Sequence, residues 1–293
     1  DLCFFALRSR LSLPDRVWNQ SSLVDSRERR RIVGDFRISP VDLLLNRRYP
    51  DVICQARSTF DTHGQTSHPV FFIRDTGKRG DCIRGNVPYR TLLPKGVEGL
   101  LVTGLGISAH RDAMPVLRMK ADIQNQGYAA GLAAALAAKE GLVPRQLNVR
   151  RLQERLVSVG NLPDEVLVWE DSLPLSHTAL ESAVERLSDG YDGLPEVLSD
   201  PVRALPLLRA RPGFERAHVR ALLGDLTAAP ELIARLEGLS WDEGWDYKGM
   251  SQYLRSVGTV DRYVIALGRT RAGAALPVLD RLASELTGES AYS

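Results

Sequence analysis

GLLVTGLGISAHRDAMPVLRMKADIQNQGYAAGLAAALAAKEG, residues 99–141, is the stretch that decides the fold of the first half of the chain. Its apolar start, Leu100-Leu101-Val102, predicts a strand buried on both faces, because no polar alternation is kept for a solvent side. A glycine-punctuated loop and a polar cluster follow. We then expect a helix with Asp122 as its N-cap, running to about Lys139, and Gly141 just past its end.

One face of the expected helix carries almost no side-chain bulk. Gly127, Gly131 and Ala135 recur at intervals of four and therefore share a face. Such a face lets another backbone or a flat ligand approach closely. The N–H groups left over at a helix start also favour an electronegative ligand group. Two interpretations stay open at this point: a helix packed tightly on a sheet, or a helix that contacts a cofactor.

The loop between the strand and the helix matches a loose dinucleotide pattern. Gly104 to Ala109 reads G-x-G-x-x-A after an apolar run. A nucleotide-phosphate loop should run directly into its helix, whereas Pro115 and the polar cluster interrupt the next dozen residues. A second βαβ strand ending in a ribose-binding acid is also missing from the sequence. We therefore do not interpret this loop as a Rossmann fingerprint.

Five motifs between about residues 20 and 160 occur in a characteristic order. They are Ser26–Asp35 (SRERRRIVGD), Val87–Arg90 followed by Leu93-Pro94, Gly104–His110 (GLGISAH), Arg118-Met119, and Gly127–Ala134 (GYAAGLAA). Together they resemble the carboxy-terminal, flavin-closing part of FAD-dependent oxidoreductases related to glutathione reductase. The resemblance implies a partial α/β flavoprotein domain of the FAD/NAD(P)-binding type, with FAD as cofactor. It also implies an enzyme that transfers hydride to or from a small organic substrate.

The resemblance places the polar cluster on the substrate side of the flavin. His110 is then the best candidate for the base, because histidine titrates near neutral pH, and Asp112 would orient it. Arg111, Arg118 and Arg90 would anchor an anionic substrate, because a planar guanidinium holds a carboxylate with two hydrogen bonds. The alternative is a structural network of Arg–Asp salt bridges beneath the flavin.

Cofactor contacts are expected from the glycine loop and from the start of the helix. Helix N–H groups near Gln124 and Asn125 would stabilise the negative charge of a reduced flavin. Tyr128 departs from the Gln or Glu that commonly occupies this place in relatives. The full set of expected contacts is Thr103, Gly104, Leu105, Gly106, Arg118, Met119, Gln124, Asn125, Gly127 and Gly131.

Metal chemistry is not expected. His63 and His68 lie close in sequence, but no third ligand of the right type accompanies them, so we expect loop hydrogen bonds instead. The three cysteines are widely spaced and form no C-x-x-C pair. This cysteine pattern favours a reducing compartment, and we expect a cytoplasmic protein. No apolar run approaches the length of a membrane span.

Two features suggest a piece of a longer flavoprotein. The sequence begins on Asp, and it contains no Gly-x-Gly-x-x-Gly unit of the kind that holds the ADP half of FAD. We therefore expect a fragment that is inactive alone and binds FAD weakly at best. The formal charge of +2 on 293 residues gives no reason to expect a nucleic-acid partner.

Shorter signals predict the remaining elements of the first half. Ser39 and Pro40 predict a helix start, with the helix running to about Arg48. Residues 51–60 and 70–74 read as strands, and residues 149–159 have apolar residues at helical spacing.

From about residue 178 the composition changes to short amphipathic helices. Leu223-Gly224 and Leu267-Gly268 begin two similar stretches 44 residues apart (268 − 224), a period typical of HEAT-like helical pairs. We therefore expect residues 1–145 as the flavoprotein part, 146–177 as a helical linker and 178–293 as HEAT-like repeats. The rival function is a non-catalytic scaffold that binds a protein partner along these repeats, with no nucleic acid and no membrane involved.

Overall fold

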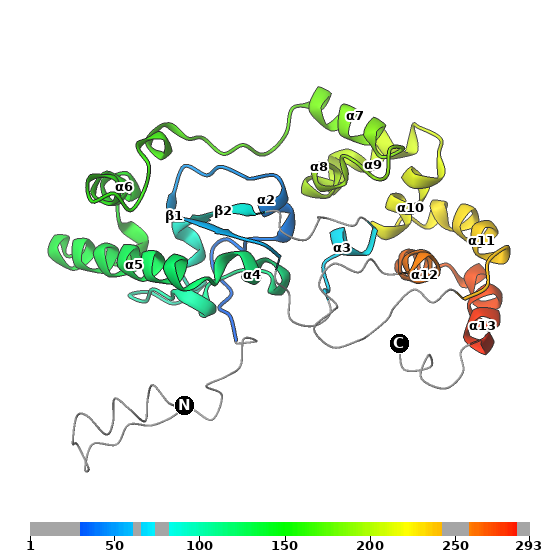
Figure 1. Ribbon diagram of the computed structural model, residues 1–293, viewed down its shortest axis with the longest axis horizontal. Helices are drawn as coiled ribbons and strands as arrows, with labels where there is room; N and C mark the ends of the chain where they lie inside the picture. The colour runs from blue at the N-terminus through cyan, green and yellow to red at the C-terminus, as the bar shows by residue number, and fades with distance from the viewer. Residues whose placement is uncertain (1–29, 61–65, 74–81, 242–257, 286–293) are drawn as a thin grey trace, which may run out of the picture. The chain divides into compact units, whose positions relative to one another are not determined.

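The computed structural model describes residues 30–60, 66–73, 82–241 and 258–285 (Figure 1). All features discussed below belong to the compact unit that begins at Arg31.

A two-stranded antiparallel sheet, β1 (Val52–Ser58) paired with β2 (Ile83–Pro88), is the only sheet in this described part. The predicted strand at 51–60 is therefore confirmed. The helix before it, α2 (Pro40–Leu44), starts as predicted: Ser39 Oγ accepts from the backbone N–H of Asp42, and the Asp42 carboxylate accepts from the backbone N–H of Ser39. It ends at Leu44 rather than near residue 48, because the chain turns at Asn46 with φ +45°.

The second predicted strand, at 70–74, is wrong. Val70–Ile73 forms a short helix, α3. Val70 and Ile73 lie three residues apart on one face of this turn, and both are buried in the same core as the helices that follow residue 177. Burial of these two side chains outweighs the strand preference of Val and Ile. His63, for which loop hydrogen bonds are expected, lies outside the described residues.

The strand predicted at Leu100–Val102 is also wrong. These residues have no strand structure, and Leu100 is 48% exposed. Gly99 and Gly104 on either side adopt φ values of +72° and +68°, so the chain turns at both ends of a run of only a few residues. One backbone hydrogen bond connects the segment to residues earlier in the chain: the N–H of Val102 donates to the carbonyl oxygen of Leu92.

The long helix of the central stretch, α5 (Lys120–Glu140), follows the short helix α4 (Met114–Leu117). Its N-cap is Met119, not Asp122, whose carboxylate instead accepts from the backbone N–H of Arg57 at the end of β1. Gly141 ends the helix in the left-handed conformation, as predicted.

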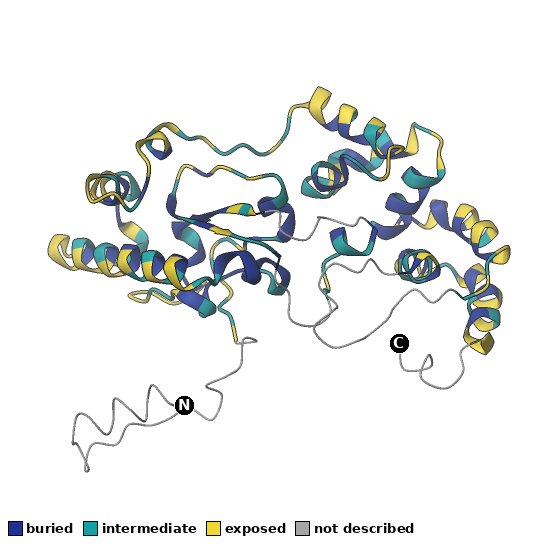
Figure 2. Ribbon diagram, viewed as in Figure 1, coloured by how far each residue is buried: buried dark blue, intermediate teal, exposed yellow. Residues whose placement is uncertain are grey.

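One side of α5 packs on the sheet and the other is open (Figure 2). Ala129, Ala133 and Ala137 are buried, whereas Gly131 is exposed. Helix α6 (Val149–Ser158) lies where the periodicity predicted it. It joins the same core, and the Gln153 side chain donates to the carbonyls of Pro50 and Val52 beside β1.

The described residues from 177 to 285 contain helices and no strand, which confirms the helical prediction for this part of the chain. The helices are α7 (His177–Arg186), α8 (Leu194–Ser199), α9 (Pro201–Arg209), α10 (Phe214–Leu222), α11 (Ala229–Glu237), α12 (Thr259–Thr270) and α13 (Leu276–Glu285). No helix in the described ranges combines the length and the hydropathy needed to cross a bilayer.

The two similar helix pairs, α10–α11 and α12–α13, align through different residues from those predicted. Gly224 follows α10 in the left-handed conformation, whereas Gly268 lies inside α12, so the two glycines are not equivalent. The residue that matches Gly224 is Arg271, also left-handed, after α12. Pro230 and Pro277 stand at the start of the second helix of each pair, 47 residues apart (277 − 230). The assignment to HEAT repeats stays a prediction.

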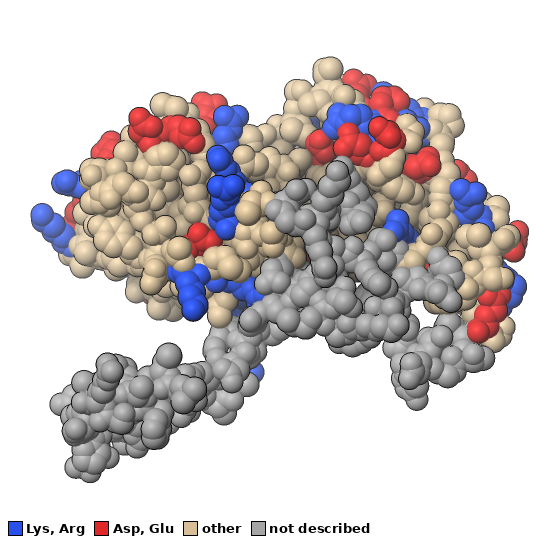
Figure 3. Space-filling view, viewed as in Figure 1, with Lys and Arg blue, Asp and Glu red and all other residues tan. Residues whose placement is uncertain are grey.

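Acidic and basic side chains lie side by side over the helices around α7–α9 (Figure 3). The Arg186 guanidinium pairs with Asp192 and Glu196. Arg209 and Arg220 both donate to the buried carboxylate of Asp225 and hold its pKa well below the usual range. Trp241 packs on the helical core, while Trp245 and Tyr247 lie outside the described residues.

A buried histidine joins α10 to its neighbours. His218 is fully buried, with Nδ1 2.8 Å from the Tyr191 hydroxyl and Nε2 3.2 Å from the carbonyl oxygen of Arg262. The rings of Phe214 and Tyr263 also contact it. Burial lowers the pKa of His218 to about 4.

We expect this histidine to make the protein sensitive to mild acid. Since the pKa of His218 is about 4 when folded and about 6.5 when unfolded, the unfolded state binds the extra proton between these values. The free energy of unfolding should therefore fall by about 3 kcal/mol as the pH drops from 6.5 to 4. Urea denaturation at several pH values would measure this. His218→Gln should flatten the dependence, whereas His177→Gln on exposed α7 should not; equal slopes in both variants would contradict the assignment.

Candidate functional site

The arginine-rich segment that begins at Arg31 lies along the loop that carries His110. The N–H of Ile32 donates to the Gly106 carbonyl at 3.0 Å, and the N–H of Ile38 donates to the Ser108 carbonyl at 3.2 Å. The N–H of His110 returns a bond of 2.7 Å to the Ile38 carbonyl. Gly34 permits this pairing, because a Cβ there would come within 2.7 Å of the Ser108 Cβ.

His110 sits at the start of a 3₁₀ turn, η3 (Arg111–Ala113), and its side chain is 20% exposed. Its Nδ1 accepts from the backbone N–H of Asp112 at 3.1 Å. Burial lowers the pKa of His110, and the nearby charges of Arg37, Arg31 and Arg111 lower it further, against an opposing effect of Asp112. The imidazole is therefore neutral at pH 7.

Asp112 acts differently from what the sequence suggested. Its buried Oδ2 accepts from the backbone N–H groups of Ser67 and His68, both at 2.7 Å, and from Ser67 Oγ at 3.4 Å. The same oxygen is 3.8 Å from His110 Nδ1, which is already occupied by a backbone N–H. The carboxylate thus fixes the segment at 67–68, and only the backbone of Asp112 orients His110.

This arrangement brings a second histidine to the site. The His68 and His110 rings lie edge to face, with centroids 5.1 Å apart and an interplanar angle of 89°. His68 Nδ1 accepts from the backbone N–H of Val70 at 3.2 Å. Burial, His110 and Arg37 lower the pKa of His68 to about 4, although Asp112 raises it.

We use the name histidine–arginine cluster for His68, His110, Arg31, Arg37 and Arg111. The sequence predicted His110 and Arg111 as site residues but not that His68 and Arg37 lie beside them. No sequence signal joins His68 to His110, because a tertiary hydrogen bond from the 67–68 segment to Asp112 makes the connection.

The structure places Arg90 elsewhere. Its guanidinium lies over the rings of Phe36 and Tyr49, at 4.8 and 5.6 Å from their centroids. Its ion pairs are with Asp51 at 3.4 Å and Asp171 at 3.6 Å. For Arg90 the alternative interpretation, a structural Arg–Asp network, fits better than a substrate anchor.

The expected cofactor loop adjoins the start of α5. Thr103 is extended and leads into a 3₁₀ turn, η2 (Gly104–Gly106), and Leu105 packs on the core. Gly104 faces the first turn of α5, since a Cβ on it would lie 3.5 Å from Ile123 Cγ2. Arg118 and Met119 connect α4 to α5, and Met119 as N-cap provides no side-chain hydrogen bond.

The glycine face of α5 is not packed against another described element. A Cβ added at Gly127 or Gly131 would meet no atom within 4 Å. Gln124 is exposed and Asn125 is partly exposed near the start of the helix. An uncapped helix start beside an unfilled glycine face suits the electronegative, planar end of a flavin. In the part of the chain that the structure describes, these residues match only the flavin end of FAD.

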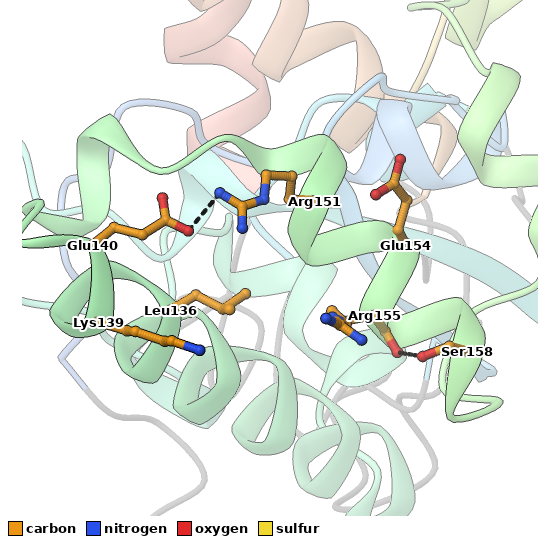
Figure 4. Close-up of a pocket in the computed structure, with 7 residues that line it drawn as sticks. All are labelled: Leu136, Lys139, Glu140, Arg151, Glu154, Arg155 and Ser158. Atoms are coloured by element: carbon orange, nitrogen blue, oxygen red, sulfur yellow. Dashed lines mark hydrogen bonds and ion pairs between the residues drawn. The ribbon is translucent and has the colours of Figure 1, made fainter.

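A charged groove of about 390 Å³ lies between α5 and α6 (Figure 4). Its lining residues are Leu136, Lys139, Glu140, Arg151, Glu154, Arg155 and Ser158, and Arg151 pairs with Glu140 at 2.6 Å. The lining contains no histidine or cysteine and shares no residue with the histidine–arginine cluster. Within the described ranges, no group of three or more His, Cys, Asp and Glu side chains is arranged to hold a metal ion.

Residues 15–156 match the family model described as FAD dependent oxidoreductase. That family uses FAD, so FAD is the cofactor indicated for this region, which contains the glycine loop, His110 and α5. The match ends within α6 and does not extend to the helices that follow. No curated protein and no solved structure matches the chain.

Proposed function

We propose that the matched region forms the flavin-closing part of an FAD-dependent oxidoreductase of the glutathione-reductase type. In this proposal the flavin lies on the Thr103–Gly106 loop and the start of α5. The histidine–arginine cluster faces a small organic substrate. The family match and the open glycine face of α5 support this assignment.

The single observation that carries the proposal is the pairing of residues 32–38 with residues 106–110. This pairing sets the histidine–arginine cluster beside the same loop that adjoins the start of α5. In this proposal the cofactor site and the substrate site are contiguous, as transfer of hydride between two bound molecules requires.

FAD, when bound, supplies the chemistry of hydride transfer. The protein residues then have three tasks. Unpaired backbone N–H groups at the start of α5 stabilise negative charge on the flavin ring of FAD. The charges of Arg31, Arg37 and Arg111 attract an anionic substrate. The neutral imidazole of His110 orients the substrate and is not a base, because its Nδ1 already accepts the backbone N–H of Asp112.

A bulky residue on the glycine face should block the cofactor without harming the fold. Gly131→Leu meets no protein atom, and leucine favours a helix more than glycine does. We therefore expect a folded protein whose affinity for FAD falls by roughly tenfold or more, since each blocked contact costs about 1 kcal/mol or more. Flavin fluorescence during FAD titration measures the affinity, and circular dichroism confirms folding.

The matched control is Gly268→Leu, because Gly268 is also an exposed glycine inside a helix with no neighbour within 4 Å. This variant should bind FAD like the unaltered protein. Equal FAD affinity of the Gly131→Leu variant and the unaltered protein would contradict the flavin position and the proposed function.

A second candidate function rests on the helical region. The units α10–α11 and α12–α13 share the same arrangement, with a left-handed residue, a 3₁₀ turn (Leu226–Ala228 or Gly273–Ala275) and a proline at the second helix start. Repeated helix pairs of this kind provide extended binding surfaces. We propose that a protein partner binds there. A protein that binds this partner but does not bind FAD would favour the scaffold function.

Cys54 and Cys82 are both free thiols, which supports a reducing, cytoplasmic environment.

A further inference from the structure

The two imidazoles of the histidine–arginine cluster share one hydrogen-bonding arrangement. We propose that His68 and His110 act together as Nε2–H donors that hold a carboxylate of the substrate. This inference rests on the proposed function for the identity of the bound molecule as a substrate, and it names the substrate class as a small organic acid.

The backbone decides which ring nitrogen carries the proton. The N–H of Asp112 donates to Nδ1 of His110 at 3.1 Å, and the N–H of Val70 donates to Nδ1 of His68 at 3.2 Å. A nitrogen that accepts a hydrogen bond carries no proton. The proton of each neutral ring is therefore on Nε2.

Both rings stay neutral at pH 7. In each ring, protonation of Nδ1 would place an N–H opposite the backbone N–H that now donates to it. Protonation of either histidine would therefore break the turn that its Nδ1 closes. Burial is the main reason that the pKa of His68 falls to about 4 and that the pKa of His110 is lowered. A neutral imidazole with a fixed Nε2–H is a hydrogen-bond donor and not a base.

The two donors are held together and remain accessible. The ring centroids are 5.1 Å apart, and the bonds from Ser67 and His68 to Asp112 join the two segments. Among the described residues, neither Nε2 has a hydrogen-bond partner, and the His110 side chain is 20% exposed. Two unused donors on rings this close are the number that the two oxygens of a carboxylate can accept.

The charges around the pair select an anion. Arg37 acts on both histidines, and Arg31 and Arg111 act on His110. Asp112, the one acidic group that the described residues bring to the site, already accepts from Ser67 and His68. Among the described residues a cationic ligand finds no unused acceptor there, whereas a carboxylate finds both donors.

Nitrogen-15 NMR of the histidine side chains tests the inference on the protein without FAD. At pH 7, we expect the Nε2–H pattern for His68 and His110. Adding acetate should shift the Nε2 signals of these two residues and not that of His177, which is exposed on α7. Acetamide, which has the same shape without the charge, should bind at least about tenfold more weakly.

Ring replacements measure the contribution of each donor. His68→Phe and His110→Phe keep a planar ring but lose the N–H, and each should weaken acetate binding about tenfold or more, since a bond to a charged group is the stronger kind. His177→Phe is the matched control and should bind acetate unchanged.

An Nδ1–H pattern in either ring of the unaltered protein would overturn the inference, and this result requires no variant to fold. Equal binding of acetate and acetamide would also overturn it. FAD titration of the Gly131→Leu variant separates the two proposals. A weakened FAD affinity in this variant, together with no acetate binding by the unaltered protein, would refute the donor pair and leave the proposed function. Acetate binding together with an FAD affinity that Gly131→Leu leaves unchanged would refute the proposed function alone.

Discussion

Replacement of Gly193 by alanine is expected to destabilise the helical region by about 4 kcal/mol or more, the range that only severe backbone or packing conflicts reach. Gly193 precedes α8 with a φ of +84°, which an alanine adopts only under strain. Its added Cβ would lie 2.2 Å from the carbonyl oxygen of Ala183 in α7, and 2.9 Å from two more backbone atoms of that residue. Backbone atoms of a packed helix cannot move aside as a flexible side chain can.

Chemical denaturation followed by circular dichroism would measure this loss. Gly190→Ala is a matched control, because Gly190 is also left-handed, with φ +56°, but a Cβ there meets no atom within 4 Å. The control should lose only about 1–2 kcal/mol, the cost of the left-handed conformation itself. If the two variants were equally stable, the close packing of α7 against the turn before α8 would be wrong.

Replacement of Asp112 by alanine is the second large effect we expect. The lost carboxylate is 1% exposed and accepts two backbone N–H bonds of 2.7 Å from Ser67 and His68. Hydrogen bonds to a charged group contribute about 1.5–3 kcal/mol each, and water replaces part of this at exposed Ser67. We therefore expect a loss of about 3 kcal/mol in the stability of the segment that carries His68.

Hydrogen exchange at the amides of Ser67 and His68 measures this local stability directly. Their protection should fall by roughly a hundredfold in the Asp112→Ala variant, as about 3 kcal/mol implies. Asp112→Asn keeps one acceptor oxygen without the charge and should retain part of the protection. Unchanged protection in the alanine variant would show that Asp112 does not fix this segment.

Gly193 and Asp112 stabilise different parts of the protein. Gly193 sets the packing of the helical region, and its effect should appear in unfolding experiments. Asp112 joins two segments of the candidate site, and its loss should also separate His68 from His110. Acetate binding is therefore expected to weaken in the Asp112 variant and to persist in a folded Gly190→Ala control.

Local signals determined several elements from the sequence alone. Ser39 and Pro40 start α2, because the capping bonds form between neighbours in the chain. Gly141 ends α5, because the left-handed conformation is easiest for glycine. The spacing of apolar residues predicted α6 and the helices after residue 177, since a periodic apolar stripe needs only a surface to cover it.

The residues of the candidate site also fall into two groups: those whose proximity the sequence predicts and those that only tertiary contacts bring together. His110, Arg111 and the glycine loop stand together in one continuous stretch, so their proximity could be predicted. The contacts of Arg90 depend on Asp51 and Asp171, and the approach of His68 depends on Asp112. No local pattern encodes either arrangement.

Tertiary contacts decided two of the three features that the sequence predicted wrongly, and a local turn decided the third. Val70–Ile73 is helical because its two apolar side chains are buried with the helices after residue 177. Leu100–Val102 is not a strand because left-handed glycines turn the chain on both sides of it. The side chain of Asp122 bonds to β1 instead of capping α5. For Val70–Ile73 and Asp122 the partners lie far away in the chain, so the deciding free energy comes from contacts that a short sequence window does not contain.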